Sequence, residues 1–151
     1  MTYDSATSPT GVGRRHPVQL AAAVVGAVFL LVGILGFIPG ITTHYGDLSF
    51  AGEDSGAKLL GIFQVSILHN IVHLLFGIVG LALARTWDGA RTFLIGGGVV
   101  YLVLWVVGLI GGADWVPVNS ADNWLHFVLG VVMVAAGYVL GREPSRSTVT
   151  T

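Results

Sequence analysis

The sequence predicts an all-α integral membrane protein built as a four-helix bundle. The chain has 151 residues, enough for one domain, and 54% of them are hydrophobic while only 10% are charged. An average soluble domain is about 25% charged, so this chain lacks the polar residues needed to cover a surface that faces water. Four apolar segments follow one another along the chain, and each approaches or exceeds the roughly 20 residues that cross a bilayer core.

These segments lie at about 18–38, 59–84, 92–113 and 122–140, inside a transmembrane domain that we place at 16–141. Residues 1–15 are polar and lack periodicity, which predicts a disordered cytoplasmic tail. Residues 142–151 form a second cytoplasmic tail. The first apolar segment is too long for a signal peptide, and no A-x-A-like site follows it, so we interpret it as a retained helix.

Helix-end signals accompany three of the segments. Pro39 and Gly40 end the first segment. Asp54 or Ser55 can cap the start of the second, and Ser120 can cap the start of the fourth.

Basic residues predict the orientation in the membrane. If the four segments cross in turn, one side of the bilayer holds Arg14, Arg15, Arg85, Arg91, Arg142 and Arg146. The other side holds Lys58 together with Asp47, Glu53, Asp54, Asp114 and Asp122. Since short cytoplasmic segments carry an excess of Lys and Arg, we expect both termini in the cytoplasm and the chain in the plasma membrane.

Two short motifs indicate an internal repeat. "NIVHLLFG" (70–77) and "NWLHFVLG" (123–130) share the pattern N-x-x-H-x-x-x-G. Upstream of each, "LVGILG" (31–36) is similar to "VVGLIG" (106–111). The order predicts two helix hairpins in parallel orientation, related by an axis along the membrane normal.

Small or polar residues recur every three or four positions in each segment, and therefore share one helix face. Such faces should meet inside the bundle, with the larger apolar side chains toward lipid. The four sets are Gly26, Gly33 and Gly40; Asn70, His73, Gly77 and Gly80; Gly97, Tyr101, Gly108 and Gly112; and Asn123, His126, Gly130, Gly137 and Gly141.

The candidate site is a polar cluster of His69, Asn70, His73, Asn123 and His126. Such residues are costly inside a membrane and usually face the protein interior. The interpretation that we favour is structural, with hydrogen bonds joining the second and fourth segments. A second is a metal site, because His69 and His73 are four residues apart and His126 could add a third nitrogen, or a haem site on facing helices. A third is binding or transport of a proton, a small solute or a lipid.

Composition and motifs exclude several other classes of function. The absence of cysteine excludes disulfides and thiolate chemistry, and a net charge of -1 gives no reason to expect nucleic acid. No G-x-S-x-G motif is present, and we do not expect an enzyme. The expected partners are the lipid bilayer and either a second copy of the chain or another membrane protein. We expect no cofactor, with haem or a divalent metal as the alternatives.

Several stretches together resemble a known family. "LLVGILGFIPG", "GIFQVSILHNIVHLLFG", "ARTFLIGGGVVYLVLW" and "NSADNWLHFVLG" are similar to a family of small bacterial integral membrane proteins classed as domain of unknown function 4383. The resemblance covers about residues 16–141 and includes the polar motifs. It implies four transmembrane helices in a bacterial plasma membrane, and it implies no activity and no functional residues.

Overall fold

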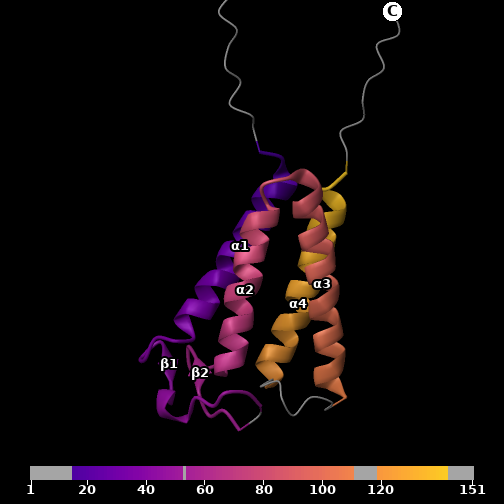
Figure 1. Cartoon of the computed structure of the whole chain (residues 1–151). Coiled ribbons are helices and arrows are strands. Elements are labelled where there is room, and N and C mark those ends of the chain that lie inside the picture. The colour runs from indigo at the N-terminus through magenta and orange to yellow at the C-terminus, as the bar shows by residue number, and fades with distance from the viewer. Residues whose placement is uncertain (1–14, 53, 111–118, 143–151) are drawn as a thin grey trace, which may run out of the picture.

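Four helices arranged as two hairpins make up most of the structure, a computed structural model that describes residues 15–52, 54–110 and 119–142. They are α1 (Pro17–Leu35), α2 (Ile67–Leu83), α3 (Trp87–Leu109) and α4 (Ser120–Val139). α1 packs along α2, and α3 packs along α4 (Figure 1). Helices α1, α3 and α4 are long and apolar enough to cross a membrane, and α2 is apolar but has 17 residues. The protein is therefore an all-α, four-helix membrane bundle, as the sequence predicts.

The two ends of the bundle differ. The start of α1, the turn from α2 to α3 and the end of α4 lie together at one end (Figure 1). The amide of Gln19 fastens this end, because its Nε2 donates to the carbonyl oxygens of Ala84 at 3.3 Å and Arg85 at 2.8 Å. The segment between α1 and α2 lies at the opposite end, which we call the loop end, together with the start of α4.

The second helix starts later than its apolar run suggests. Residues 59–66, expected as its first two turns, instead join a three-stranded antiparallel sheet of β1 (Thr42–Thr43), β2 (Lys58–Leu59) and β3 (Phe63–Gln64). Leu60 and Gly61 have φ values of 54° and 74° and form the turn between β2 and β3, which a helix does not permit. An apolar run alone does not distinguish a buried strand from a helix.

The helix caps differ from those expected. Ser66, rather than Asp54 or Ser55, caps α2 by accepting a hydrogen bond from the backbone N–H of His69. Asn119 caps α4, and its backbone N–H in turn donates to the carboxylate of Asp122. Helix α1 ends at Leu35 and not at the expected residue 38, and the hydroxyl of Thr42 donates to the carbonyl oxygens of Leu35 and Gly36 at this end. The expected end of the third helix at Ala113 lies outside the described residues, as do Glu53, Asp114 and all but one residue of each expected tail, 1–15 and 142–151.

Glycines let the helices of each hairpin approach closely. A Cβ atom at Gly26 would lie 3.2 Å from the carbonyl oxygen of Gly77, and a Cβ at Gly98 would lie 2.8 Å from that of Gly130. The expected small faces thus meet within each hairpin, while the larger apolar side chains are exposed around the bundle. This is the packing typical of membrane helices, in which small residues bring backbones together.

The hairpins repeat one packing pattern, in a register three residues from the expected one. Gly36 packs against the amide of Asn70, and Gly108 packs against the amide of Asn123. Gly36 therefore corresponds to Gly108, whereas aligning "LVGILG" with "VVGLIG" would pair Gly33 with Gly108. The alignment of glycine runs gave the wrong offset because glycines recur at helical spacing throughout both segments.

Candidate functional site

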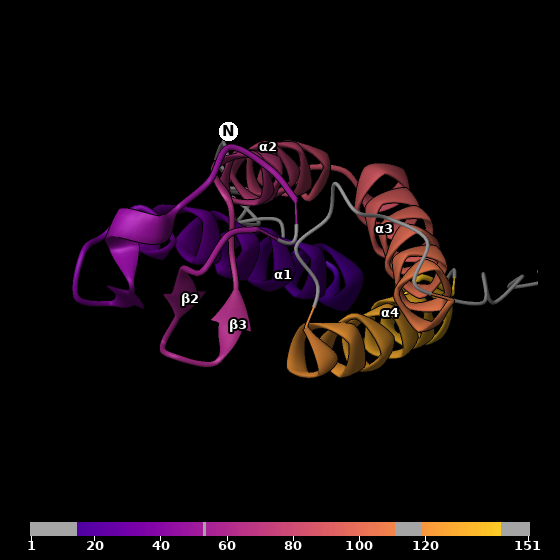
Figure 2. The ribbon, with the colours of Figure 1, turned by 90° about the horizontal axis from the view of Figure 1, so that it is seen from below.

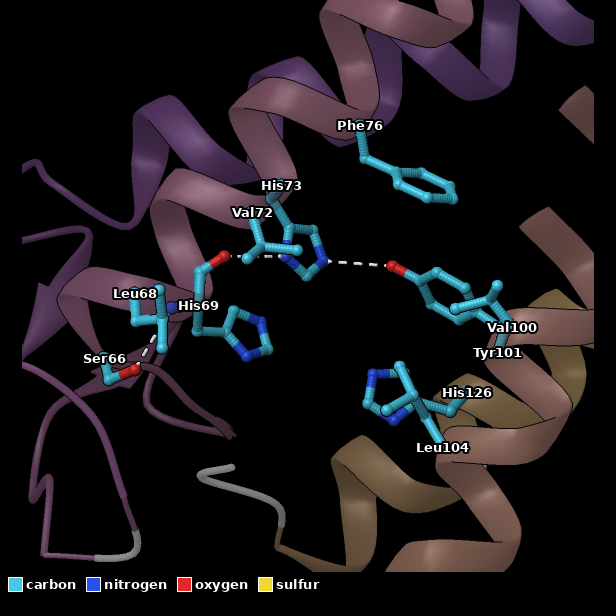
Figure 3. A pocket seen from close by; sticks show the side chains of 10 residues that line it. All are labelled: Ser66, Leu68, His69, Val72, His73, Phe76, Val100, Tyr101, Leu104 and His126. Atoms are coloured by element: carbon cyan, nitrogen blue, oxygen red, sulfur yellow. Dashed lines mark hydrogen bonds between the residues drawn. The ribbon is translucent and has the colours of Figure 1, made fainter. Parts of the chain in front are cut away.

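A cavity of about 290 Å³ lies between the two hairpins. Figure 3 shows side chains of α2 on one wall and side chains of α3 and α4 on the other. The lining is mainly apolar, with three histidines and one tyrosine among the polar groups. The lining residues are Ser66, Leu68, His69, Val72, His73, Phe76, Val100, Tyr101, Leu104 and His126.

A pair of aromatic rings from α1 and α3 lies where the hairpins meet. Phe29 and Tyr101 stack with their ring centroids 5.2 Å apart. Each ring also packs edge-on against a histidine of its own hairpin, Phe29 against His73 at 5.7 Å and Tyr101 against His126 at 5.0 Å. In the repeat register set by Gly36 and Gly108, Phe29 corresponds to Tyr101 and His73 to His126. The four rings therefore form a pseudo-symmetric cluster around the contact between hairpins.

Hydrogen bonding breaks this symmetry. The Nδ1 atom of His73 lies 3.1 Å from the carbonyl oxygen of His69, and its Nε2 lies 3.3 Å from the hydroxyl oxygen of Tyr101. Because a carbonyl only accepts, Nδ1 must carry the proton and donate, and the Tyr101 hydroxyl must donate to Nε2. Both nitrogens of His73 are thus satisfied by the protein, and Figure 3 draws both bonds.

His126, the counterpart of His73, lacks both bonds. Its ring makes no hydrogen bond with any residue in the described parts of the chain, and its Nδ1 is buried without a partner. The residue is only 5% exposed. His73 receives a hydrogen bond from the hydroxyl of Tyr101. The residue that corresponds to Tyr101 in the repeat is Phe29, which has no hydroxyl to offer His126. A buried polar group without a partner is unusual and calls for an explanation.

His69 completes the polar part of the cavity. Its ring stacks on that of His73 with centroids 4.3 Å apart and an interplanar angle of 14°. Figure 3 shows it across the cavity from His126. The structure therefore brings together three residues of the predicted five-residue cluster, His69, His73 and His126.

Asn70 and Asn123 do not join this cavity. Asn70 is fully buried against Gly36 of the loop after α1, and Asn123 packs against Gly108 of α3. The expected hydrogen bonds between the second and fourth helices are absent at these two residues. Among the described residues, the Oδ1 and Nδ2 atoms of Asn70 and the Oδ1 atom of Asn123 have no hydrogen-bond partner. Each asparagine fills space within its own hairpin.

The geometry gives little support for a metal or haem ligand set. Neither nitrogen of His73 is free, since one donates to a backbone carbonyl and the other accepts from Tyr101. Over residues 15–52, 54–110 and 119–142, no three side chains of His, Asp or Glu form a group that could hold a metal ion. His69 lies flat against His73, which is not how two imidazoles converge on one ion.

Exposed apolar residues of α2 and α3 mark the mouth of the cavity. Val72 of α2 and Val100 of α3 line the cavity, and they are 49% and 47% exposed. Seen from the loop end, α2 and α3 lie on one side of the molecule and α1 and α4 on the other (Figure 2). The opening between Val72 and Val100 therefore lies on the α2–α3 side, where the exposed surface is apolar.

The loop end is tied to α4 beside the cavity. One carboxylate oxygen of Asp122, Oδ2, accepts from the backbone N–H groups of Gln64 at 2.9 Å and Asn119 at 3.2 Å. The Nδ2 of Asn119 donates to the carbonyl oxygen of Ile62 at 2.7 Å. We call these contacts the loop latch. They hold β3 of the first hairpin against the first turn of the second.

Two features of the site escaped sequence reasoning. Tyr101 stood out only as part of a small-residue stripe, although it is the one polar aromatic residue in that stripe. Asp122 stood out only as one of the acidic residues expected on one side of the membrane, and its contact with Gln64 depends on the path of a loop that sequence periodicity does not describe. Apart from Ser66, which caps α2, the remaining lining residues are apolar side chains and carry no distinguishing signal.

The fold and the cavity define a small helical membrane protein with a histidine-lined space between two repeated hairpins. Residues 19–139 match the family described as Domain of unknown function (DUF4383), and the chain belongs to this family. No curated protein matches the chain. No solved structure matches it either.

Proposed function

We propose that the protein binds a small, neutral, amphipathic molecule in the cavity between the hairpins, and that this molecule enters from the bilayer. The observation that carries the proposal is His126, a buried imidazole on the cavity wall that makes no hydrogen bond with the described residues. A ligand carrying a hydroxyl or carbonyl group would satisfy it. Asn70 and Asn123 are structural in this proposal.

The size and the chemistry of the cavity define the ligand class. A volume of about 290 Å³ is close to the lower end of the range for small-molecule sites, roughly 300–1,000 Å³. Among the residues that the structure describes, no Asp, Glu, Lys or Arg lines it, so these residues offer a charged ligand no counter-ion. Phe76, Val100 and Leu104 favour an apolar body, and the histidines favour a single polar group.

The cellular setting is part of the proposal. We place the protein in a bacterial plasma membrane with both termini in the cytoplasm. The placement is supported by the family resemblance and by Arg15, Arg85, Arg91 and Arg142 at the end of the bundle opposite Lys58.

A photoprobe with two matched variants tests the cavity. A benzophenone-bearing fatty alcohol should crosslink the purified wild-type protein within residues 66–76 or 100–104. Val100→Trp should block this labelling, because Val100 lines the cavity mouth. Val99→Trp should leave it unchanged, because Val99 is equally exposed at 49% but does not line the cavity.

The readout is the mass of crosslinked peptides, with thermal unfolding confirming that both variants fold. His126→Phe should keep the probe body bound but reduce its crosslinking at the polar end of the cavity. Equal labelling of the wild type, Val99→Trp and Val100→Trp would contradict the proposal.

A further inference from the structure

A second cavity lies at the opposite end of the molecule from the loop end. It is a groove of about 450 Å³ between the start of α3 and the end of α4. We call it the arginine groove, and its lining residues are Trp87, Arg91, Tyr138, Gly141 and Arg142. No described residue lines both this groove and the histidine-lined cavity, so the inference does not depend on the proposed ligand, although it rests on the proposed orientation in the membrane.

An aromatic residue and an arginine line this groove from each side, at the start of α3 and at the end of α4. On α3, the guanidinium carbon of Arg91 lies 5.9 Å from the ring centroid of Trp87. At the end of α4, that of Arg142 lies 5.2 Å from the ring centroid of Tyr138. In both pairs the arginine follows the aromatic residue by one helical turn. Both contacts are within the range of cation–π attraction, which orients the two guanidinium groups.

The position of Arg91 is further fixed by Gly141. A Cβ atom at Gly141 would lie 2.7 Å from Cδ and 2.9 Å from Cγ of Arg91. The aliphatic stem of Arg91 therefore crosses α4 where only a glycine leaves room. The side chain therefore lies between Trp87 of its own helix and the backbone at the end of the neighbouring one, which restricts its conformations.

Neither guanidinium group has a counter-ion in the part of the chain that the structure describes. No carboxylate there lies within ion-pair distance of Arg91 or Arg142, although Asp88 is one turn before Arg91 on α3. Two positive charges on one groove attract an anion, and arginine matches the geometry of a phosphate group with paired N–H donors. Trp and Tyr prefer the boundary between lipid tails and headgroups, which places the groove at headgroup depth.

We propose that the arginine groove binds the phosphodiester group of an anionic lipid, with Arg91 and Arg142 on the phosphate and with Trp87 and Tyr138 beside the glycerol region. Basic pockets between transmembrane helices on the cytoplasmic side are suited to such headgroups. The aromatic pair favours a membrane lipid over a free phosphate ion, which would gain nothing from their apolar faces.

Native mass spectrometry of the purified full-length protein tests this assignment. Dioleoyl-phosphatidylglycerol and dioleoyl-phosphatidylcholine are titrated in separate samples, and retained lipid is counted. The wild type should retain phosphatidylglycerol in preference to phosphatidylcholine. The double variant Arg91→Gln/Arg142→Gln should weaken the binding of phosphatidylglycerol about thirtyfold. The loss of one cationic side chain near an anionic membrane surface weakens binding roughly fivefold to sixfold, and the two losses multiply.

The control removes the same charge from the same end of the bundle. Arg15→Gln/Arg85→Gln leaves the groove lining intact and should change retention only slightly. Thermal unfolding of each variant separates loss of binding from loss of folding.

Two results would overturn the assignment. Equal weakening by the two double variants would mean that diffuse positive potential, and not the groove, attracts the lipid. Retention of inorganic phosphate at millimolar concentration, with no preference for phosphatidylglycerol over phosphatidylcholine, would mean that the groove is a site for a free anion.

Discussion

Two glycine–asparagine contacts fix how each hairpin closes at the residue scale. The amide of Asn70 lies so close to Gly36 that no Cβ fits between them, and Asn123 and Gly108 repeat the arrangement. These asparagines show why the site was only partly predictable. Their spacing placed them beside the histidines on the same helices, but each amide packs against a glycine of its own hairpin instead. Periodicity identifies a face and does not say which neighbour the face meets.

Alanine at these glycines should destabilise the protein. We expect Gly36→Ala and Gly108→Ala each to lower the free energy of unfolding by about 1–3 kcal/mol, because the new methyl group overlaps a buried amide with little room to move. Gly96→Ala is the control, since nothing lies within 4 Å of its Cβ position, and there alanine should be neutral or mildly stabilising.

The measurement is reversible unfolding of the purified protein in mixed micelles. Equal stability of Gly36→Ala and Gly96→Ala would contradict the close packing at Asn70. Adding Asn70→Ala to Gly36→Ala should recover part of the lost stability, because the smaller side chain leaves room for the methyl group.

The helices themselves were largely predictable at the element scale, and the loop was not. Apolar length and glycine spacing identified all four helices and their buried faces, because burial in each hairpin follows helical periodicity. The start of α2 was misplaced because the apolar residues that begin at Leu59 are compatible with a buried strand as well as with a helix. The loop latch was not predicted, because it joins Gln64 to Asp122, which are 58 residues apart in the sequence. A pattern of neighbouring residues carries no information about such a contact.

Removing the loop latch should free the β2–β3 hairpin without unfolding the bundle. In Asp122→Ala, the backbone N–H of Gln64 loses its acceptor. A hydrogen bond to a charged acceptor is worth about 1.5–3 kcal/mol, so amide exchange at Gln64 should accelerate roughly tenfold to a hundredfold.

Hydrogen exchange read by mass spectrometry follows this segment directly. Asp88→Ala is the matched control, because Asp88 also lies in the first turn of its helix but makes no contact with the sheet. Exchange within α1 and α2 should stay slow in both variants. Unchanged exchange at Gln64 in Asp122→Ala would show that other contacts hold the sheet in place.

The whole molecule is a pair of similar hairpins with different ends. Basic residues gather where the chain enters α1, turns from α2 to α3 and leaves α4, and acidic residues gather at the loop end. The sequence could predict this polarity because it depends only on residue order and on the number of crossings. It could not predict the cavity, which depends on how far the two hairpins separate.

Cysteine labelling tests the proposed orientation. The chain has no native cysteine, so a single introduced thiol gives an unambiguous signal. Tyr45→Cys in the loop end should react with a membrane-impermeant maleimide in intact cells, whereas Arg85→Cys should react only after permeabilisation. Labelling of Arg85→Cys from outside, with Tyr45→Cys protected, would reverse the topology.

The short second helix has a mechanical consequence for the surrounding lipid. Its 17 residues span about 25 Å at 1.5 Å per residue, while a typical hydrocarbon core is about 30 Å thick. Lipid chains beside α2 must shorten or tilt to match it, and the elastic energy of that deformation is a fraction of a kcal/mol per ångström. A membrane with shorter acyl chains relieves this strain, so the protein should partition into the thinner regions of a heterogeneous bilayer.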